Sequence, residues 1–288
     1  MDTLIISVIQ MLYAVASLVV VASGLAVIFG MVKVINLAHG EFMMLGAYAT
    51  IEFAQLGVNI WVAIFLLAPG FVALVGLVLE RLVVRHLYGR MVDTMLATWG
   101  LSLLLVGVVT SIVGNTTTGI SAPLGTFTVG AYSVSTYTLV IIFVAVAIIV
   151  AMRWILTRTS LGLIARGTMQ NAKMADVLGV DPRKVYSATF AVGAALSGLA
   201  GALLAPLTGV VPTMGGAFVA RAFITVVGGG PALVSGLLSA SSLFGVVNQF
   251  ATYMWTPVAG EVALLLAAII MLRLLPQGIT GRFFRRSL

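Results

Sequence analysis

The chain has 288 residues, of which 61% are hydrophobic and 8% charged, and its formal net charge at pH 7 is +7. Soluble domains carry roughly 25% charged residues, so this composition excludes a soluble globular protein and indicates a polytopic membrane protein. The sequence has no cysteine, which excludes disulfides, thiolate metal sites and thiol redox chemistry. We therefore expect an all-α fold, with residues 1–288 forming a single transmembrane domain.

Apolar stretches recur along the whole chain, and each crossing of a bilayer needs about 20 helical residues. The sequence predicts about eight transmembrane helices. A short broken or re-entrant segment is expected over residues 217–227, because a glycine triplet and a proline follow it. The eight helices are expected at residues 4–30, 41–56, 60–79, 95–113, 137–152, 186–207, 232–250 and 259–275.

Most of the basic residues form three clusters that lie between the apolar stretches. In membrane proteins, lysine and arginine concentrate in cytoplasmic loops, so all three clusters are expected inside the cell. This placement predicts an external N-terminus and a cytoplasmic C-terminus, and it explains the positive charge without nucleic acid. The clusters are Arg81, Arg85 and Arg90; Arg153, Arg158, Arg166, Lys173, Arg183 and Lys184; and Arg273, Arg282, Arg285 and Arg286.

The densest polar group near the membrane interrupts the first two expected helices. It contains Asn36, His39, Gly40 and Glu41. Ionisable groups inside a membrane are costly, so one interpretation places these residues in a polar translocation pathway or at its gate. The other interpretation is an interfacial turn in which Glu41 lies near a helix N-terminus. His39 and Glu41 alone are too few ligands for a metal site.

The largest basic segment, at about residues 153–184, is expected to be a cytoplasmic loop that docks a soluble partner. The sequence predicts a short helix over residues 169–178 that ends at Gly179, followed by a new helix with Asp181 as N-cap and Pro182 at its first position. Alternatively, the short helix lies on the membrane surface and its basic residues contact anionic lipid.

Two glycine-rich features follow. Small residues at a spacing of four, with others beside them, line the helix expected at 186–207, where they allow close approach of another helix within the chain or in a second subunit. The helix-packing candidates are Gly193, Ser197, Gly198 and Gly201. The second feature is the turn at Gly228, Gly229 and Gly230, a further candidate for the pathway or gate. Arg221 and Glu261 are expected to extend separately to lipid headgroups.

Several catalytic motifs are absent from the sequence. It has no G-x-x-x-x-G-K-[ST] loop, so we expect no nucleotide hydrolysis by the P-loop route in this chain. It also lacks H-E-x-x-H and G-x-S-x-G, which removes the simplest hydrolase interpretations. These absences predict that the chain is not itself an enzyme, and that it has no cofactor and no metal.

Four motifs, in order along nearly the whole chain, closely resemble those of inner-membrane permeases from branched-chain amino-acid ABC importers of the LivH type. The first contains the segments GLAVIFG, VINLAHGEF and LGAY (24–30, 34–42 and 45–48), and the second contains MADVLGV and TFAVGAALSGLAG (174–180 and 189–201). The last two are VVGGG (226–230) and LPQGI (275–279).

The resemblance implies a multi-pass permease of the bacterial inner (plasma) membrane. It implies four partner subunits: a second permease subunit of the LivM type, two cytoplasmic ATP-binding subunits and a periplasmic substrate-binding protein. It also implies that residues 166–184 couple to the ATPases, with Arg166, Lys173, Ala175, Asp176 and Gly179 as the candidate residues.

Substrate identity is less sharply indicated than transporter identity, because permeases for urea and short-chain amides share the motif around residues 36–41. The exact solute, the pore-lining helix faces, and a homomeric or heteromeric permease pair are all left open. The polar segment and the glycine-rich break also suit a stand-alone channel or an ion-coupled carrier. A scaffolding membrane protein is the third alternative.

Overall fold

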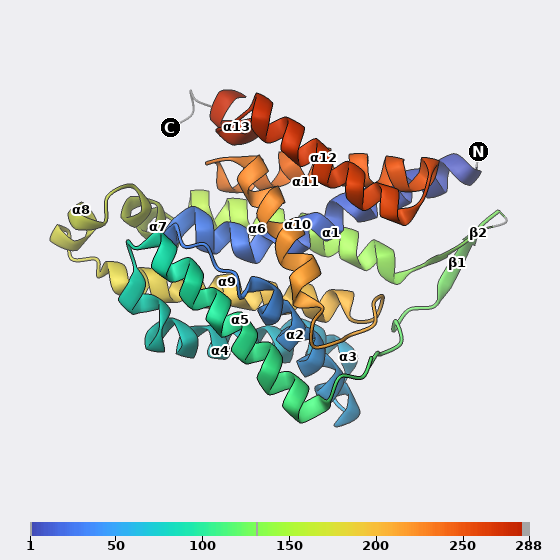
Figure 1. Ribbon diagram of the computed structural model, residues 1–288, viewed down its shortest axis with the longest axis horizontal. Coiled ribbons are helices and arrows are strands. Elements are labelled where there is room, and N and C mark those ends of the chain that lie inside the picture. Colours follow the sequence, from blue (N-terminus) through green and yellow to red (C-terminus); the bar gives the residue numbers. More distant parts are fainter. Residues whose placement is uncertain (1, 131, 284–288) are drawn as a thin grey trace. The chain divides into compact units, whose positions relative to one another are not determined.

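The computed structural model describes residues 2–130 and 132–283, and the chain is mostly helical (Figure 1). Arg285 and Arg286 of the last basic cluster lie outside the described residues. The chain forms two compact units. Unit 1 contains the residues up to Ala22, Ala122–Val150 and those from Arg221 onward, and unit 2 contains Ser23–Ser121 and Ala151–Ala220.

Seven helical segments within the described residues are long and apolar enough to cross a membrane. They match seven of the eight expected crossings, which supports a multi-pass membrane protein. The eighth expected crossing, at 41–56, is a helix of 17 residues, and the count of eight therefore stays a prediction. The seven segments are Ile5–Val32, Ile60–Leu82, Met91–Val113, Tyr137–Arg158, Pro182–Leu204, Leu233–Met254 and Pro257–Gly281.

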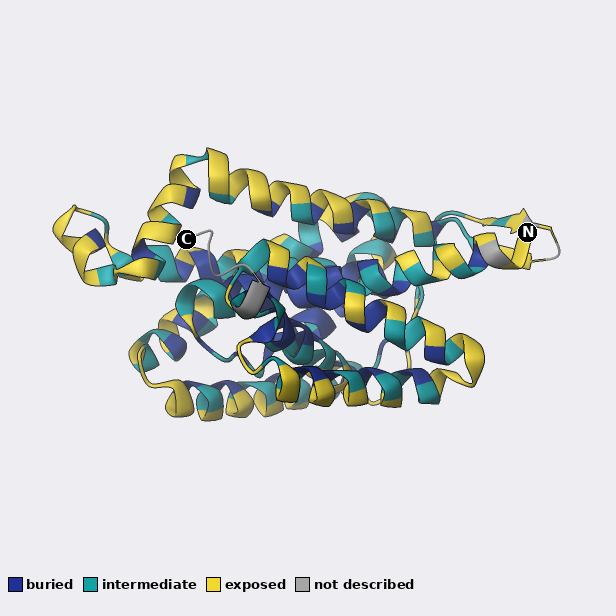
Figure 2. Cartoon of the chain, turned by 90° about the horizontal axis from the view of Figure 1, so that it is seen from above, coloured by how far each residue is buried: buried dark blue, intermediate teal, exposed yellow. Residues whose placement is uncertain are grey.

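Exposed residues follow one face of many helices and buried residues follow the other, as Figure 2 shows. The exposed faces carry large apolar side chains, among them Leu103, Ile112 and Phe143. A soluble protein would not leave so much apolar surface in water, but hydrocarbon chains solvate it well.

Unit 2 is built around α9 (Pro182–Leu204). This helix packs most extensively against α4 (Ala68–Leu82) and α2 (His39–Gln55). The other elements with residues in this unit are α1 (Asp2–Val32), α3 (Ile60–Val62), the π-helical turn η1 (Ala63–Leu67), the 3-10 turn η2 (Val84–Leu87), α5 (Met91–Val113), the end of α6 (Tyr137–Arg158), α7 (Ser160–Gln170), α8 (Ala172–Val177) and the start of α10 (Gly215–Gly229).

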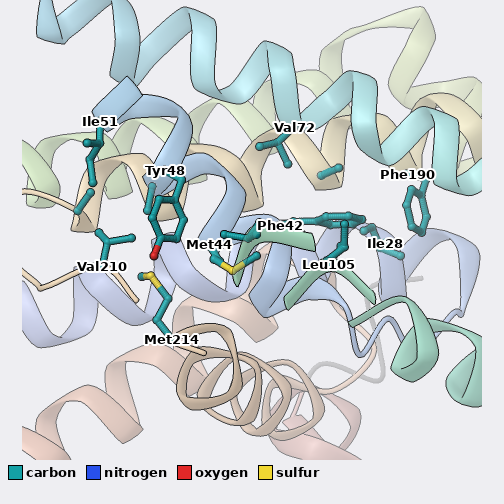
Figure 3. Close-up of a cluster of buried hydrophobic side chains, with 14 of the residues drawn as sticks. Ile28, Phe42, Met44, Tyr48, Ile51, Val72, Leu105, Phe190, Val210 and Met214 are labelled. Atoms are coloured by element: carbon teal, nitrogen blue, oxygen red, sulfur yellow. The ribbon is translucent and has the colours of Figure 1, made fainter. Parts of the chain in front are cut away.

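The apolar core of unit 2 lies where α2 and α9 meet (Figure 3). Phe42 and Phe190 pack edge to face, with ring centroids 6.1 Å apart. Tyr48, Met44 and Met214 extend this core along α2, and Figure 3 shows the Tyr48 hydroxyl directed toward Met214. Because most of α2 is buried in this way, the helix is held by protein rather than by lipid.

Unit 1 has its own core between α11 (Leu233–Met254) and α12 (Pro257–Leu274). Phe244, Leu264 and Met271 are buried in it, together with Leu18 of α1. The unit also contains the first part of α1, most of α6, the end of α10 and the terminal helix α13 (Gly278–Phe283).

A small antiparallel hairpin precedes α6 in unit 1. Its strands are β1 (Thr126–Val129) and β2 (Tyr132–Ser135). The sequence analysis assigned no element between the helices expected at 95–113 and 137–152, because the alternating threonine, valine and serine residues are too few for a clear strand pattern.

The helix following the basic segment begins as expected. The Asp181 side chain accepts a hydrogen bond from Arg183 N at 2.9 Å, and Pro182 occupies the first turn. The prediction of one short helix over 169–178 was wrong at its start, because α7 continues to Gln170 and Asn171 then adopts an extended conformation. Asn171 Oδ1 accepts from Met174 N at 3.0 Å, so this residue caps a new helix, α8.

Candidate functional site

A partly buried non-helical segment, residues 33–38, separates α1 from α2. Lys33 begins it with a positive φ of 56°, and Val34, Asn36 and Ala38 are buried. Non-helical backbone at membrane depth requires polar partners from the protein, since lipid supplies none. The main-chain N–H and C=O groups of residues 33–38 therefore need hydrogen-bond partners from other parts of the chain.

Two polar side chains supply those partners. Asn36 Oδ1 accepts a hydrogen bond from Ala38 N at 3.1 Å, which forms a local turn. Thr98 of α5 accepts from Leu37 N at 3.1 Å and its hydroxyl lies 3.2 Å from Ile35 O. Thr98 thus fixes both edges of the segment to α5. Asn36 Nδ2 is buried and has no hydrogen-bond partner among the described residues.

His39 begins α2 and is completely buried. Its Nδ1 lies 2.9 Å from Ser197 Oγ, and the same hydroxyl lies 2.8 Å from Gly193 O. A serine hydroxyl has one proton, so both contacts are satisfied at once if His39 Nδ1 donates to Ser197 and Ser197 donates to Gly193. The sequence analysis predicted His39 as a pathway or gate residue and Ser197 as a helix-packing residue. In the structure the two side chains are in contact.

Glu41 is buried beside the point where the N-termini of α2 and α10 meet. Its side chain is 4% exposed, and the carboxylate lies beside Ser102 of α5. A Cβ on Gly215 would lie 2.8 Å from Glu41 Oε1, and one on Gly40 would overlap the Gly215 main chain, so both positions need glycine. Glu41 Oε2 has no hydrogen-bond partner among the described residues. The positive ends of two helix dipoles therefore face one buried acidic side chain.

The pathway interpretation of this polar segment predicts that Glu41→Ala reduces solute uptake about tenfold or more while the chain still folds, because the change removes the buried carboxylate. Uptake by reconstituted vesicles would measure the effect. The matched control is Glu52→Ala on the exposed side of α2, which should leave uptake unchanged. Normal uptake by Glu41→Ala would reduce the site to a structural turn.

The small residues of α9 lie at close helix contacts inside unit 2. Gly193 and Ser197 face Gly24 of α1, and Gly201 faces the main chain of Met43 in α2. Gly198 is also in this face, where a Cβ would meet Val72 of α4. The candidate residues Gly193, Ser197, Gly198 and Gly201 therefore line intrachain contacts, the first of the two interpretations that the sequence left open.

The glycine triplet occupies a different place, in unit 1. Gly228 and Gly229 still belong to α10, so the expected turn begins later than predicted, at Gly230, where φ is +82°. Thr280 of α13 holds the turn, since its hydroxyl donates to Gly229 O at 2.6 Å and accepts from Ala232 N at 3.2 Å. The structure does not group this turn with Asn36, His39, Gly40 and Glu41, which belong to unit 2.

The central part of the basic segment forms two short helices, α7 and α8, which are called the α7–α8 excursion below. Arg166, Lys173 and Asp176 are exposed and Ala175 is buried. Gly179 ends α8 with φ of +86°, as its sequence position predicted, and Val180 N donates to Ala175 O at 3.0 Å. Lys173, Ala175 and Asp176 therefore lie on α8 and Gly179 ends it, whereas Arg166 lies on the preceding helix α7.

An apolar face on α8 and its cap is also exposed. The exposed fractions are 56% for Met174, 83% for Val177 and 75% for Leu178. All three side chains lie within six residues of exposed charged groups, so the patch is amphipathic. Such a surface fits either a protein partner or a lipid surface.

Two polar groups that the sequence interpretation missed are ion pairs. Arg221 and Glu261 were expected to extend to headgroups separately, but Arg221 Nη2 lies 2.7 Å from Glu261 Oε1 and Nε lies 3.1 Å from Oε2. The second group contains Glu80, whose carboxylate is fully buried, and Arg85 at 3.6 Å. The only sequence signal for either pair is a carboxylate at the edge of an apolar helix.

Comparison with known proteins is consistent with this geometry. Residues 7–275 match the family model described as "Branched-chain amino acid transport system / permease component". The high-affinity branched-chain amino acid transport system permease protein LivH of Escherichia coli K12 is 27% identical over 278 residues, covering 91% of this chain and 90% of the relative. The corresponding protein BraD of Pseudomonas aeruginosa is 28% identical over 280 residues, covering 91% of each.

A further relative and one solved structure are also similar to this chain. The probable branched-chain amino acid transport permease protein LivH of Methanocaldococcus jannaschii is 28% identical, covering 92% of this chain and 88% of the relative. The PsaBC structure from Streptococcus pneumoniae, solved in complex with Fab, superposes with a TM-score of 0.52 at 15% identity. It covers 97% of this chain and 94% of that one, so the likeness extends over the fold.

Proposed function

Since this chain belongs to the family of branched-chain amino acid transport permeases, we propose that it is the permease subunit of an ATP-driven ABC importer. The solute is a branched-chain, hydrophobic amino acid. The membrane is the inner (plasma) membrane, which the chain crosses several times. The observation that carries the proposal is the family match over residues 7–275, because it includes both the polar break and the exposed basic segment.

We propose that all of residues 1–288 act as one permease domain, with the N-terminus outside and the C-terminus inside. The positive-inside rule supports this orientation. It places the turn around Arg85, the excursion formed by α7 and α8, and the end of α12 on the same cytoplasmic side. In this orientation α2 is the eighth crossing, and α10 is the short broken segment whose inward pass makes the number of passes odd, as termini on opposite sides require.

The energy for transport comes from other subunits. The sequence has no P-loop, so two cytoplasmic ATP-binding subunits supply hydrolysis. A second permease subunit and a periplasmic substrate-binding protein complete the importer. The exposed apolar face at Met174, Val177 and Leu178, together with Arg166, Lys173 and Asp176, is the surface that an ATP-binding subunit contacts.

The solute pathway involves the polar break between α1 and α2. Asn36 and Glu41 each have one buried polar atom without a partner among the described residues, and buried groups of this kind are retained where they serve a function. Gly40 allows the start of α2 to approach Gly215 closely, and His39 attaches the same turn to Ser197 of α9. Gly228, Gly229 and Gly230, where α10 ends, are a separate candidate for a gate.

The full complex, reconstituted in vesicles, tests the proposal. We expect uptake of leucine, isoleucine or valine that requires both ATP and the binding protein. Thermal shift or calorimetry of the binding protein with the same amino acids, urea and short amides identifies the solute. Uptake by this chain alone, without ATPases, would show a channel or carrier instead, and binding of urea or amides only would replace the solute.

Asp176→Arg is expected to weaken docking of the ATP-binding subunits, because it reverses a charge within the exposed α8 surface. Co-purification of the ATPases should fall about tenfold or more, while membrane insertion is unchanged. Asp176→Asn separates loss of charge from reversal, and Asp93→Arg is a matched reversal at another exposed site. Normal co-purification and normal uptake by Asp176→Arg would exclude α8 as the docking surface.

A further inference from the structure

A polar network connects the turn between α4 and α5 to the first turns of α9. The Tyr88 hydroxyl donates to Glu80 Oε1 at 2.8 Å, and Arg85 Nε lies 3.6 Å from the same oxygen. Arg85 Nη2 donates to Ser187 Oγ at 2.9 Å. Four side chains from separate segments thus form one continuous chain of contacts within unit 2.

The centre of the network is a buried carboxylate. Glu80 is 0% exposed, and its second oxygen has no hydrogen-bond partner among the described residues. A buried charge is tolerated only where its partners are present, so Tyr88 and Arg85 hold each other in place through Glu80. Burial and the neighbouring Glu80 carboxylate raise the pKa of the Tyr88 hydroxyl, which therefore stays a donor at physiological pH.

Further contacts fix both sides of the network. On the α9 side, Ser187 Oγ donates to Arg183 O at 3.0 Å, and the Tyr186 ring packs edge to face on Tyr88, with centroids 5.2 Å apart. On the α5 side, Thr94 Oγ1 lies 3.0 Å from Leu87 O. The turn is therefore attached to the start of α9 and to the start of α5 at once.

The position of the network in the chain suggests its role. α9 begins at Pro182, directly after the α7 and α8 excursion. If α7 and α8 are displaced, α9 is the first helix to move with them. Arg85 and Tyr88 contact the first turns of α9, so they receive this movement next. An exposed ion pair would yield to such a displacement, whereas a buried and shared carboxylate resists it.

We propose that Glu80, Arg85, Tyr88 and Ser187 form a joint that transmits movement of the α7 and α8 segment to α4 and α5. This inference rests on the proposed function, because it presumes that ATP-binding subunits move that segment. The four residues are positioning residues. They contact no solute, and they set how much helix movement each ATP hydrolysis produces.

The reconstituted complex with Glu80→Gln or Tyr88→Phe tests the joint. Both changes keep side-chain shape and remove a charge or a hydroxyl. We expect normal co-purification of the ATPases and hydrolysis within about twofold of wild type, with uptake reduced about tenfold, so that ATP consumed per solute rises about tenfold. Arg81→Gln, an exposed neighbour of Glu80, is the control and should keep the wild-type ratio.

Ser187→Ala provides a milder variant that keeps the buried Glu80 contacts, in case the first two lower the yield of folded protein. It should raise ATP consumed per solute about threefold. An unchanged ratio in Tyr88→Phe and Ser187→Ala, with both folded, would overturn the joint and leave the proposed function intact. Absence of ATP-dependent uptake by the wild-type complex would overturn the proposed function and the joint together.

Discussion

Gly201→Leu is expected to prevent accumulation of folded protein, the largest effect of any single substitution proposed for this chain. A Cβ at Gly201 would overlap the main chain of Met43, so any side chain forces α9 away from α2. Overpacking usually costs about 1–3 kcal/mol, and the cost is larger where the obstacle is backbone that cannot rotate away. Detergent-solubilised yield and thermal unfolding would measure the loss.

A matched glycine separates this contact from helix propensity. Gly107 in α5 has open space around its Cα, so Gly107→Ala should be neutral or stabilise the helix by up to about 1 kcal/mol. Gly201→Ala should destabilise despite the same gain in propensity. Equal melting temperatures for Gly201→Ala and Gly107→Ala would show that α2 and α9 are not in close contact.

Glu261→Ala is expected to produce the second largest effect, because it removes the carboxylate that pairs with Arg221 in an otherwise apolar helix. A charged side chain costs about 2.5–3.5 kcal/mol at the middle of a membrane helix, and pairing offsets much of that cost. The Arg221 and Glu261 side chains are 37% and 43% exposed, so the loss here lies below that range. The two charges make a two-point contact, at 2.7 and 3.1 Å. The melting temperature and the fraction of chain inserted in the membrane should both fall.

The reciprocal exchange tests whether the pair itself carries the effect. Arg221→Glu combined with Glu261→Arg restores opposite charges and should recover most of the lost stability, whereas each single reversal should be worse than Glu261→Ala. Asn248 Nδ2 lies 3.5 Å from Glu261 Oε1. This contact is lost in the exchange, because arginine at position 261 has no acceptor. Failure of the double variant to exceed both single reversals would show that the two residues act independently.

Most of the helical fold could be predicted because hydrophobic length is a local property. The expected segments at 60–79 and 137–152 differ from the observed ones mainly at their ends. The start of α8 was mispredicted because Asn171 competes with a helix through its own side chain, which depends on backbone conformation. Asp181 and Pro182 were predicted correctly, since a cap followed by proline is a strong local pattern.

The candidate sites were less predictable, because their partners are distant in sequence. His39 contacts Ser197 across 158 positions, and Glu80 reaches Ser187 through Arg85 across about a hundred. Nothing in the residue types at 80, 85 and 88 distinguishes a buried network from an ordinary cytoplasmic basic cluster. Only the packing of α4 on α9 shows that Glu80 is removed from water.

The short helix α2 has a consequence for the choice of membrane. At 17 residues it is about 25 Å long, less than the hydrocarbon thickness of about 30 Å. Such a mismatch normally thins the bilayer, but α2 is mostly buried by other helices. The lipid contacts longer helices such as α5, of 23 residues, which matches a bilayer of ordinary thickness. A helix buried inside the protein, such as α2, can therefore be shorter than the bilayer is thick without the free-energy cost of hydrophobic mismatch.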